Sequence, residues 1–161
     1  SNQATLWLDE CVSCYLSTKS NEIILSSISK INVNSIYISF HPMISLKNYN
    51  NDFGRMLLSK FKERGAPIIN NYNDHNDIYQ FYSDCNWKYI TSFDINTAMS
   101  LLIPLDCQIP KKISLFDEYS SLALLLRHYV IIISTNNNNY YSLTDNLTNK
   151  MSIHRKKNIK V

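Results

Sequence analysis

The sequence predicts an α/β fold, a sheet with helices on its faces, and three observations lead to this prediction. Short apolar runs rich in β-favouring residues recur along the chain, and stretches with helical apolar spacing separate them. Apolar residues make up 45% of the 161 residues and charged residues 18%, the composition of an ordinary globular domain. The expected order is β-α-β-α-α-β-α-β, which is typical of an α/β sheet.

Strands are expected at residues 5–8, 36–40, 88–93 and 130–134. The first run, TLWL, is short and bounded by polar residues, which suits a strand covered on both faces. The second run ends at His41 and Pro42, because a proline cannot donate a hydrogen bond to a continuing ladder.

Helices are expected from residue 22 to 31 and over 50–64, 77–85, 96–103 and 114–126. Ser17, Thr18 and Ser20 offer cap oxygens before the first of them. Gly65 is expected as a left-handed stop after the second, with Pro67 just beyond it. Each helix carries its apolar residues on one face, so each is expected to pack against the sheet.

The folded part is expected to span residues 1–135, one domain or part of one, and residues 136–161 form an asparagine-rich, basic tail that is loosely ordered. Much of the net charge of +3 lies in this tail, so the body is a poor candidate for a nucleic-acid surface. The basic run at 154–160 fits a nucleic-acid-binding arm or, as is usual for short charge runs, a solvated segment.

The four cysteines do not predict a metal site. Cys11 and Cys14 form a CxxC pair, but Cys85 and Cys107 stand alone without a second pair or a matching histidine. Buried thiols in a reducing compartment are the expected state. Because no signal peptide or membrane-length apolar run is present in the sequence, we expect a soluble, cytoplasmic protein.

Candidate site residues follow the first two strands. In an open α/β sheet ligands bind beyond the carboxyl ends of the strands, so Glu10, Tyr15 and His41 are candidates. The structural alternative is that Glu10 caps the following loop and that Tyr15 packs in the core. From these residues alone the structural alternative is favoured, because short patterns of this kind mislead easily.

Arg127 and His128 are expected to be structural. They precede the last strand, and the start of a parallel strand lies at the edge opposite the ligands. We expect them to pair with a carboxylate such as Asp94 or Glu118. The sequence contains no glycine-rich turn of the kind that binds phosphate. Its two glycines are Gly54 and Gly65, and neither lies between a strand and a helix.

Four stretches together resemble the latter part of the leucine carboxyl methyltransferase family. ECVSCYL at 10–16 is similar to the family's SECxxxYM segment, and DFGRM at 52–56 to its D-x-F-G-x-x-M helix start. NW at 86–87, followed by a strand and then Phe93-Asp94, is similar to its GW…D passage. LRHY at 126–129 enters the last strand as the family's MRHY does. Two departures are Phe40-His41, where the family has tyrosine-glutamate, and Ser13, where it has an apolar residue.

The resemblance implies strands four to seven of a class I methyltransferase sheet that uses S-adenosylmethionine. The family methylates the C-terminal leucine carboxylate of the type-2A protein phosphatase catalytic subunit. By resemblance, Tyr15 binds the substrate carboxylate and is the catalytic candidate, Glu10 and Cys11 belong to the cofactor site, and His41 is a substrate-pocket residue. No metal is implied. Phe40-His41 weakens the assignment of a role to the loop at 41–46.

The earlier half of the family fold carries the cofactor loop, the ribose-binding acid and a substrate-binding arginine, and this chain lacks all three. We therefore expect a fragment that is inactive by itself. The strand from Thr5 to Asp9 would be interior in an intact sheet, so we expect the missing N-terminal half or a neighbouring chain to cover its edge.

Two other functions stay open on the sequence. A relative with the same fold could methylate another acceptor, such as a tRNA base or a small metabolite, because this half says little about the acceptor. The chain could also be an inactive binding module that retains the second half of the fold.

Overall fold

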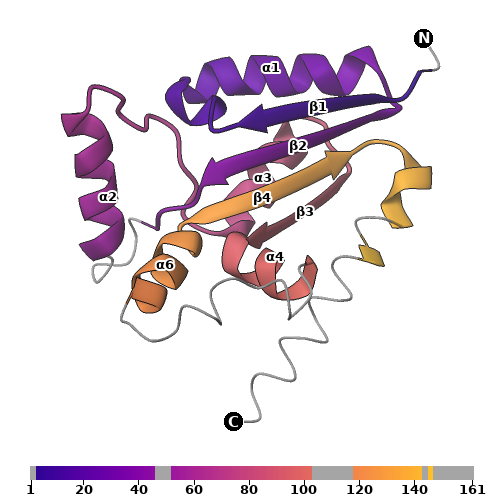
Figure 1. The fold of residues 1–161 in the computed structure, drawn as a ribbon. Coiled ribbons are helices and arrows are strands. Elements are labelled where there is room, and N and C mark those ends of the chain that lie inside the picture. Colours follow the sequence, from indigo (N-terminus) through magenta and orange to yellow (C-terminus); the bar gives the residue numbers. More distant parts are fainter. Residues whose placement is uncertain (1–2, 46–51, 103–117, 143–144, 147–161) are drawn as a thin grey trace.

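The computed structural model describes residues 3–45, 52–102, 118–142 and 145–146, and side chains are described within these ranges except at 100–102 and 118–121. Figure 1 shows strands at the centre with helices around them. The elements, in chain order, are β1 (Thr5–Glu10), the 3-10 turn η1 (Ser13–Tyr15), α1 (Thr18–Ile31), β2 (Ser35–Pro42), α2 (Asp52–Glu63), α3 (His75–Asp84), β3 (Tyr89–Asp94), α4 (Ile95–Leu102), α6 (Glu118–Leu126) and β4 (Tyr129–Thr135).

The four strands form one mixed sheet in the order β1-β2-β4-β3. β1 and β2 run parallel, with Leu8 opposite Ile38. β4 lies between β2 and β3 and runs antiparallel to both. The last strand in sequence is therefore an interior strand of the sheet, and it is flanked by neighbours that run the other way.

The α/β fold predicted from the sequence is confirmed. The predicted order of elements is also found except between β3 and β4, where the structure has two helices, α4 and α6, and the predicted order had one. Ser17 caps α1 by accepting a hydrogen bond from the Ser20 N–H, and Gly65 ends α2 with φ of 76°. The end of β2 was predicted too early: the strand continues through Pro42, which lies opposite Tyr129. A proline is accommodated there because it is the last residue of the strand. The connection expected over 105–112, the helix start near 114 and the tail at 147–161 lie outside the described residues.

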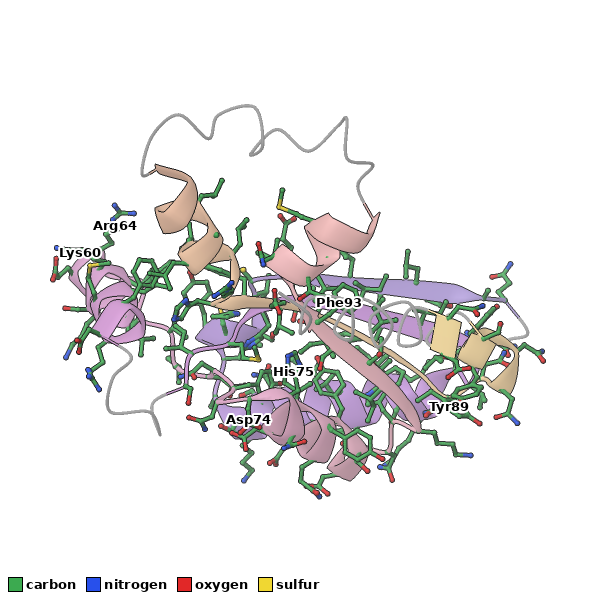
Figure 2. All side chains as sticks on the ribbon, turned by 90° about the horizontal axis from the view of Figure 1, so that it is seen from below. Lys60, Arg64, Asp74, His75, Tyr89 and Phe93 are labelled. Carbon is green, nitrogen blue, oxygen red and sulfur yellow. The ribbon has the colours of Figure 1, made fainter. Side chains whose placement is uncertain are left out.

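One face of the sheet is covered by α1 and α3. Figure 2 shows the sheet between these two helices and the pair α4 and α6 on the other side. Alternate strand residues point into the covered face, as the period of two requires. The core between sheet and helices consists of Leu25, Ile28, Tyr37, Tyr72, Ile78, Tyr82, Cys85, Trp87, Val130 and Ile132.

The opposite face is covered mainly over β3 and β4. α4 contacts both of these strands, and its Ala98 and the strand residue Phe93 are buried. Over β1 the same face of the sheet is exposed to solvent. Leu6 and Leu8 are 64% and 72% exposed on this face. Apolar side chains at alternate positions of a strand normally mark a buried face, so the exposed face over β1 is one that another element could cover.

The first asparagines after β4 contact the body of the protein. The side-chain oxygen of Asn136 accepts the Lys88 N–H at 2.9 Å, and the Asn137 amide donates to the Asn34 side chain at 2.7 Å. The rings of Tyr89 and Tyr141 lie 4.8 Å apart. Residues 136–141 therefore lie along the end of the sheet, whereas the proposed boundary at 135 stays a prediction.

Replacing Asp74 by alanine is expected to lower the free energy of unfolding by about 1 kcal/mol, the usual contribution of an N-cap. The Asp74 carboxylate accepts the backbone N–H groups of Asn76 and Asp77, each at 2.9 Å, at the start of α3. Urea denaturation measures the loss. Asp84→Ala at the other end of α3 removes an exposed bond to Gln80 and should change stability by less than about 0.5 kcal/mol. Equal losses in the two variants would contradict the capping role.

Candidate functional site

One edge of the sheet gathers the candidate residues. Because β4 is antiparallel, this edge holds the carboxyl ends of β1, β2 and β3 together with the start of β4: Glu10 is opposite Phe40, and Val130 is opposite both His41 and Asp94. We call it the carboxyl edge. The prediction that Arg127 and His128 lie at the opposite edge was wrong, since it assumed a parallel last strand.

The turn that follows β1 is held by Asp9. The Oδ1 atom of Asp9 accepts the backbone N–H groups of Val12 at 3.0 Å and Ser13 at 3.2 Å. The Oδ2 atom accepts the hydroxyl of Ser13, that of Tyr37 at 3.1 Å and that of Ser39 at 2.9 Å. The capping role that the structural alternative gave to Glu10 therefore belongs to Asp9, the residue before it.

Asp9 is ionised in spite of its burial. Burial alone would raise its pKa, but the hydrogen bonds from Ser13 and Ser39 and from the N–H groups of Ser13 and Val12 outweigh it and lower the pKa below 3.8. Burial and the negative charge of Asp9 in turn raise the pKa of Tyr37, so this phenol stays a donor. A buried anion with this many donors is a fixed structural charge.

The two cysteines of the turn are protonated thiols. Burial, together with Cys11 and Asp9, raises the pKa of Cys14 from 9.0 to about 12. Burial and the neighbouring carboxylates of Asp9 and Glu10 raise the pKa of Cys11. The Cys14 thiol donates to the Cys11 carbonyl at 3.2 Å. Because the thiolate is the reactive form, neither residue is an activated nucleophile at neutral pH.

Tyr15 lies at the carboxyl edge and not in the core. It ends η1 and is 37% exposed. Burial raises the pKa of Tyr129. In the same turn as Tyr15, the Cys11 N–H donates to the Phe40 carbonyl at 2.9 Å. The Tyr129 ring stacks on Phe40 with 5.2 Å between centroids and 7° between planes. The structure therefore brings Cys11, Tyr15 and two further aromatic rings together.

Glu10 shares a sheet face with this aromatic pair. Glu10 is opposite Phe40 in the parallel ladder, so the two side chains point to the same side, and this is the face on which Leu6 and Leu8 are exposed. The Glu10 carboxylate is itself exposed. An exposed carboxylate next to two stacked rings favours a cationic ligand over an anionic one.

His41 points to the other face and is closed off from solvent. Its relative exposure is 0%, its Nδ1–H donates to the Pro42 carbonyl at 2.8 Å, and its ring lies 4.7 Å from that of Tyr72. Tyr72 and Tyr82 are also buried. His41 thus lies in the interior on the Asp9 side of the sheet, its Nε2 atom has no hydrogen-bond partner within the described residues, and a contact with substrate stays a prediction.

The stability of the protein is expected to fall as the pH drops below 6.5, in part because of His41. Burial lowers the pKa of His41 below 6.5, more than the Pro42 carbonyl and the Asp9 charge raise it. Below pH 6.5 the unfolded chain therefore binds a proton at His41 that the folded chain does not bind. Stability is complete above pH 6.5 and decreases between pH 6.5 and the lower pKa of His41 in the folded protein. Urea denaturation between pH 5 and 8, compared with His41→Leu, measures this; an unchanged pH dependence in the variant would exclude His41 as the source.

Two further stretches meet the carboxyl edge. The Phe53 ring at the start of α2 lies 5.0 Å from the ring of His128, and the Nδ1–H of His128 donates to the Leu124 carbonyl at 2.7 Å. The Asp94 carboxylate accepts the N–H and the hydroxyl of Thr97, both at 2.8 Å, and so caps α4. The suggested pairing of Arg127 or His128 with Asp94 or Glu118 stays a prediction, and the side chain of Glu118 lies outside the described residues.

α2 stands beyond the ends of β1 and β2 (Figure 1), with its first turn towards the sheet. Figure 2 shows Lys60 and Arg64 at its far end, pointing away from the strands. Lys60 is paired with Glu63 at 2.8 Å on the exposed surface. The contact that α2 makes with the site is therefore the aromatic one at Phe53, and Lys60 and Arg64 lie away from the carboxyl edge.

A groove of about 280 Å³ runs between β1 and α1 and is open to solvent. Its walls are mostly apolar, with Trp7 and Leu8 from β1 and Ile24 and Ile28 from α1. Asp9, Ser13 and Asn21 supply the polar end, where the Asn21 amide donates to the Ser13 carbonyl at 2.8 Å. The groove lies beside the outer edge of the sheet.

Sequence reasoning missed the residues that hold the site together. It named Asp9 only as the end of a strand and passed over Tyr37 and Ser39. The available signal was the alternation of Ser35, Tyr37 and Ser39 within an apolar run, which puts hydroxyl groups on one face of a buried strand. A buried row of hydroxyls needs an acceptor, and Asp9 on the neighbouring strand is that acceptor.

Within the described ranges, His, Cys, Asp and Glu side chains form no group of three or more that could hold a metal ion. The same residues include no helix with the length and apolar character needed to cross a membrane.

No protein-family model and no curated protein matches this chain. Among solved structures, the chain is similar to a proposed O-methyltransferase from Nostoc punctiforme PCC 73102, with 9% sequence identity and a TM-score of 0.49. The similarity covers 83% of this chain and 32% of the other. The chain thus spans about a third of the length of that structure.

Proposed function

We propose that this chain is the second half of an S-adenosylmethionine-dependent methyltransferase domain related to the leucine carboxyl methyltransferases. The proposed acceptor is the C-terminal leucine carboxylate of the type-2A protein phosphatase catalytic subunit. In this proposal the 161-residue chain by itself is inactive, because the first half of the domain would supply most of the cofactor site.

The observation that carries the proposal is that a part of each of the four motif stretches lies at the carboxyl edge, although Asn86 and Trp87 of the third stretch precede β3 and lie at its other end. The 10–16 and 126–129 stretches are linked through Phe40, whose carbonyl accepts the Cys11 N–H and whose ring stacks on Tyr129, although more than a hundred residues separate the two stretches. The 52–56 stretch contacts the last one through Phe53 and His128. Asp94, which ends the third stretch, lies opposite Val130. Motifs that are distant in sequence and adjacent in space are typical of a shared ligand site.

The residues present fit a cationic cofactor and an anionic acceptor. The exposed Glu10 carboxylate beside Phe40 and Tyr129 suits the positive charge of S-adenosylmethionine. The Tyr15 hydroxyl can donate a hydrogen bond to a substrate carboxylate. Cys11, a neutral thiol between the two, can pack against the ligand without adding charge.

The reaction needs orientation more than acid or base. A C-terminal carboxyl group is ionised at neutral pH, so no base is needed to activate it. The bound cofactor, next to Glu10, would supply an electrophilic methyl group to a carboxylate oxygen, with a neutral thioether as the leaving group. Tyr15 would hold the acceptor in line and the aromatic pair would exclude water, and both effects lower the barrier.

Two measurements test the proposal. Methyl transfer by the full-length gene product is expected with phosphatase subunits that keep the terminal leucine and lost with subunits that lack it. Calorimetry with S-adenosylmethionine and S-adenosylhomocysteine is expected to give binding to the full-length product and none to the 161-residue chain. Transfer to the truncated subunit would contradict the acceptor, and a full-length product that binds neither compound would contradict the methyltransferase function.

We further propose that the N-terminal half of the domain covers the outer edge of β1 from Thr5 to Asp9. The Thr5 and Cys11 N–H groups donate to the Asn34 and Phe40 carbonyls of the β2 side. Alternation along the strand then turns the N–H groups of residues 6, 8 and 10 outwards. β1 is flanked by the open groove on one face and by the exposed leucines on the other. One added strand with helices on both of its faces would therefore cover the outer edge of β1, the groove and the leucines.

Amide hydrogen exchange tests this edge. The amides of residues 6, 8 and 10 should exchange at least about tenfold more slowly in the full-length product than in the 161-residue chain, because a paired amide must open before it exchanges. The Ile132 amide in the interior strand is the control. Slow exchange in the isolated chain that depends on its concentration would instead identify a second copy as the cover, and equal fast exchange in both proteins would contradict the proposal.

A further inference from the structure

The backbone between β1 and α1 includes an unfavourable conformation that something must hold. Cys11 has φ of 53°, in the left-handed region that side chains other than glycine rarely adopt. Glu10 precedes it and Tyr15 follows it in the same turn, which we call the 10–15 turn. A strained residue persists only where its surroundings fix it, so the positions of Glu10 and Tyr15 depend on the contacts that fix Cys11.

Four groups tie this turn to the body of the protein. From β2, the Phe40 carbonyl accepts the Cys11 N–H at 2.9 Å. From α1, the Asn21 amide donates to the Ser13 carbonyl. From the loop before α3, the N–H groups of Ile69 and Asn70 donate to the Cys14 carbonyl at 2.9 and 3.0 Å. From β1 itself, the Asp9 carboxylate accepts the two N–H groups and the hydroxyl described above. Of these ties, the one through Asp9 holds Val12 and Ser13, the two residues that directly follow Cys11, and it uses three donors of the turn.

Asp9 cannot serve the ligand directly in this arrangement. Only 7% of it is exposed, and both of its oxygen atoms are occupied by donors from the turn and from β2. It points to the sheet face that α1 and α3 cover, whereas Glu10 points to the opposite face. Its influence on the position of groups at the carboxyl edge therefore passes through the turn, which it holds by three hydrogen bonds.

We propose that Asp9 is a positioning residue for this site: its carboxylate fixes the 10–15 turn and thereby orients Glu10, Cys11 and Tyr15, without contacting the ligand. The ligand named here rests on the proposed function, whereas the link between Asp9 and the turn does not. The required feature is an acceptor oxygen facing two N–H groups. The negative charge is secondary, because the hydroxyls of Ser13, Tyr37 and Ser39 can rotate and accept as well as donate.

Three substitutions separate positioning from general stabilisation. Asp9→Asn keeps an oxygen towards the turn and turns its NH₂ group towards the hydroxyls. Asp9→Ala removes every acceptor. Tyr37→Phe removes a buried partner of Asp9 on β2 and leaves the bonds to Val12 and Ser13 in place. Ser13→Ala, which removes one hydroxyl bond within the turn, serves as a milder change if Asp9→Ala does not fold.

Hydrogen exchange at the Val12 and Ser13 amides is measured against the Ile132 amide in the interior strand. In Asp9→Ala we expect exchange at Val12 and Ser13 to accelerate at least about tenfold more than at Ile132, since a lost bond to a charged acceptor opens the turn locally. Asp9→Asn should stay within about threefold of the wild type, and Tyr37→Phe should leave the ratio unchanged. Ser13→Ala should raise the ratio modestly.

Two outcomes would overturn the inference. Asp9→Asn accelerating the turn amides as much as Asp9→Ala would mean that charge, not acceptor geometry, is required. Proportional acceleration at Val12, Ser13 and Ile132 would mean that Asp9 only stabilises the whole fold. In the full-length product, affinity for S-adenosylhomocysteine should fall at least about tenfold in Asp9→Ala and return in Asp9→Asn. A full-length wild type that does not bind contradicts the proposed function, and the exchange ratios then still decide the role of Asp9.

Discussion

Replacing Asp9 by alanine is expected to lower the free energy of unfolding by about 3 kcal/mol, because hydroxyls in the interior lose an acceptor that nothing else replaces. Tyr37 is 5% and Ser39 0% exposed, so in the folded protein these hydroxyls have little contact with water that could replace the carboxylate. Urea denaturation of the two proteins at pH 7 measures the difference. Asp52→Ala, which removes an exposed carboxylate bonded to Arg55, is the control and should change stability by less than about 0.5 kcal/mol.

The effect of Asp9 is also expected to depend on pH. Its pKa in the folded protein is lowered, so its contribution is complete above about 3.8 and is lost as the pH falls through the folded value. The wild type and Asp9→Ala should therefore converge in stability in strong acid. A constant difference down to pH 2, or a loss no larger than that of Asp52→Ala at pH 7, would contradict the role of a buried acceptor.

Ile132→Ala is expected to lower the free energy of unfolding by about 3–4 kcal/mol, the usual range for removing a fully buried aliphatic side chain and leaving a cavity. Ile132 lies at the centre of the interior strand with 0% exposure, on the face that α1 and α3 cover. Close packing around it leaves little room for the neighbours to fill the space. Equilibrium denaturation with urea measures the loss.

Leu8→Ala is the matched control for Ile132→Ala. Leu8 is 72% exposed, so the same kind of truncation should change the stability of this chain by less than about 0.5 kcal/mol. In a longer protein whose N-terminal half covers β1, the same change should become strongly destabilising. A large loss in the 161-residue chain would mean that this face is already covered.

The sequence predicted the elements well because the local signals agreed with one another. Local preferences agree with the fold at the apolar run at 130–134, at the cap Ser17 and at Gly65, and tertiary packing did not override them. The direction of β4 was not predictable in this way. Strand direction depends on the connection and on the neighbouring strands. An apolar run such as VIII does not indicate whether the strand pairs parallel or antiparallel.

The site was predicted in part for the same reason. Glu10 and Tyr15 could be placed at a carboxyl end because they follow a strand directly. The buried side chains that fix them could not, because Tyr37 and Ser39 meet Asp9 only through the register of two strands. His41 shows the reverse case: its strand end was predicted, but the side of the sheet to which it points, the buried one, depended on that register.

The central position of β4 has a consequence for the order of folding during synthesis. In the described sheet, β3 is hydrogen-bonded to β4 alone, and β4 is the last strand to leave the ribosome. β1 and β2 can pair early, but β3 must wait until residue 135 has emerged, and the β2–β4 ladder joins residues such as Ile36 and Thr135 that lie far apart in the chain. Such distant pairing is slow. The nascent chain therefore carries an unpaired β3 until β4 has emerged, and a stop codon before β4 would leave the sheet without the strand that joins its two parts.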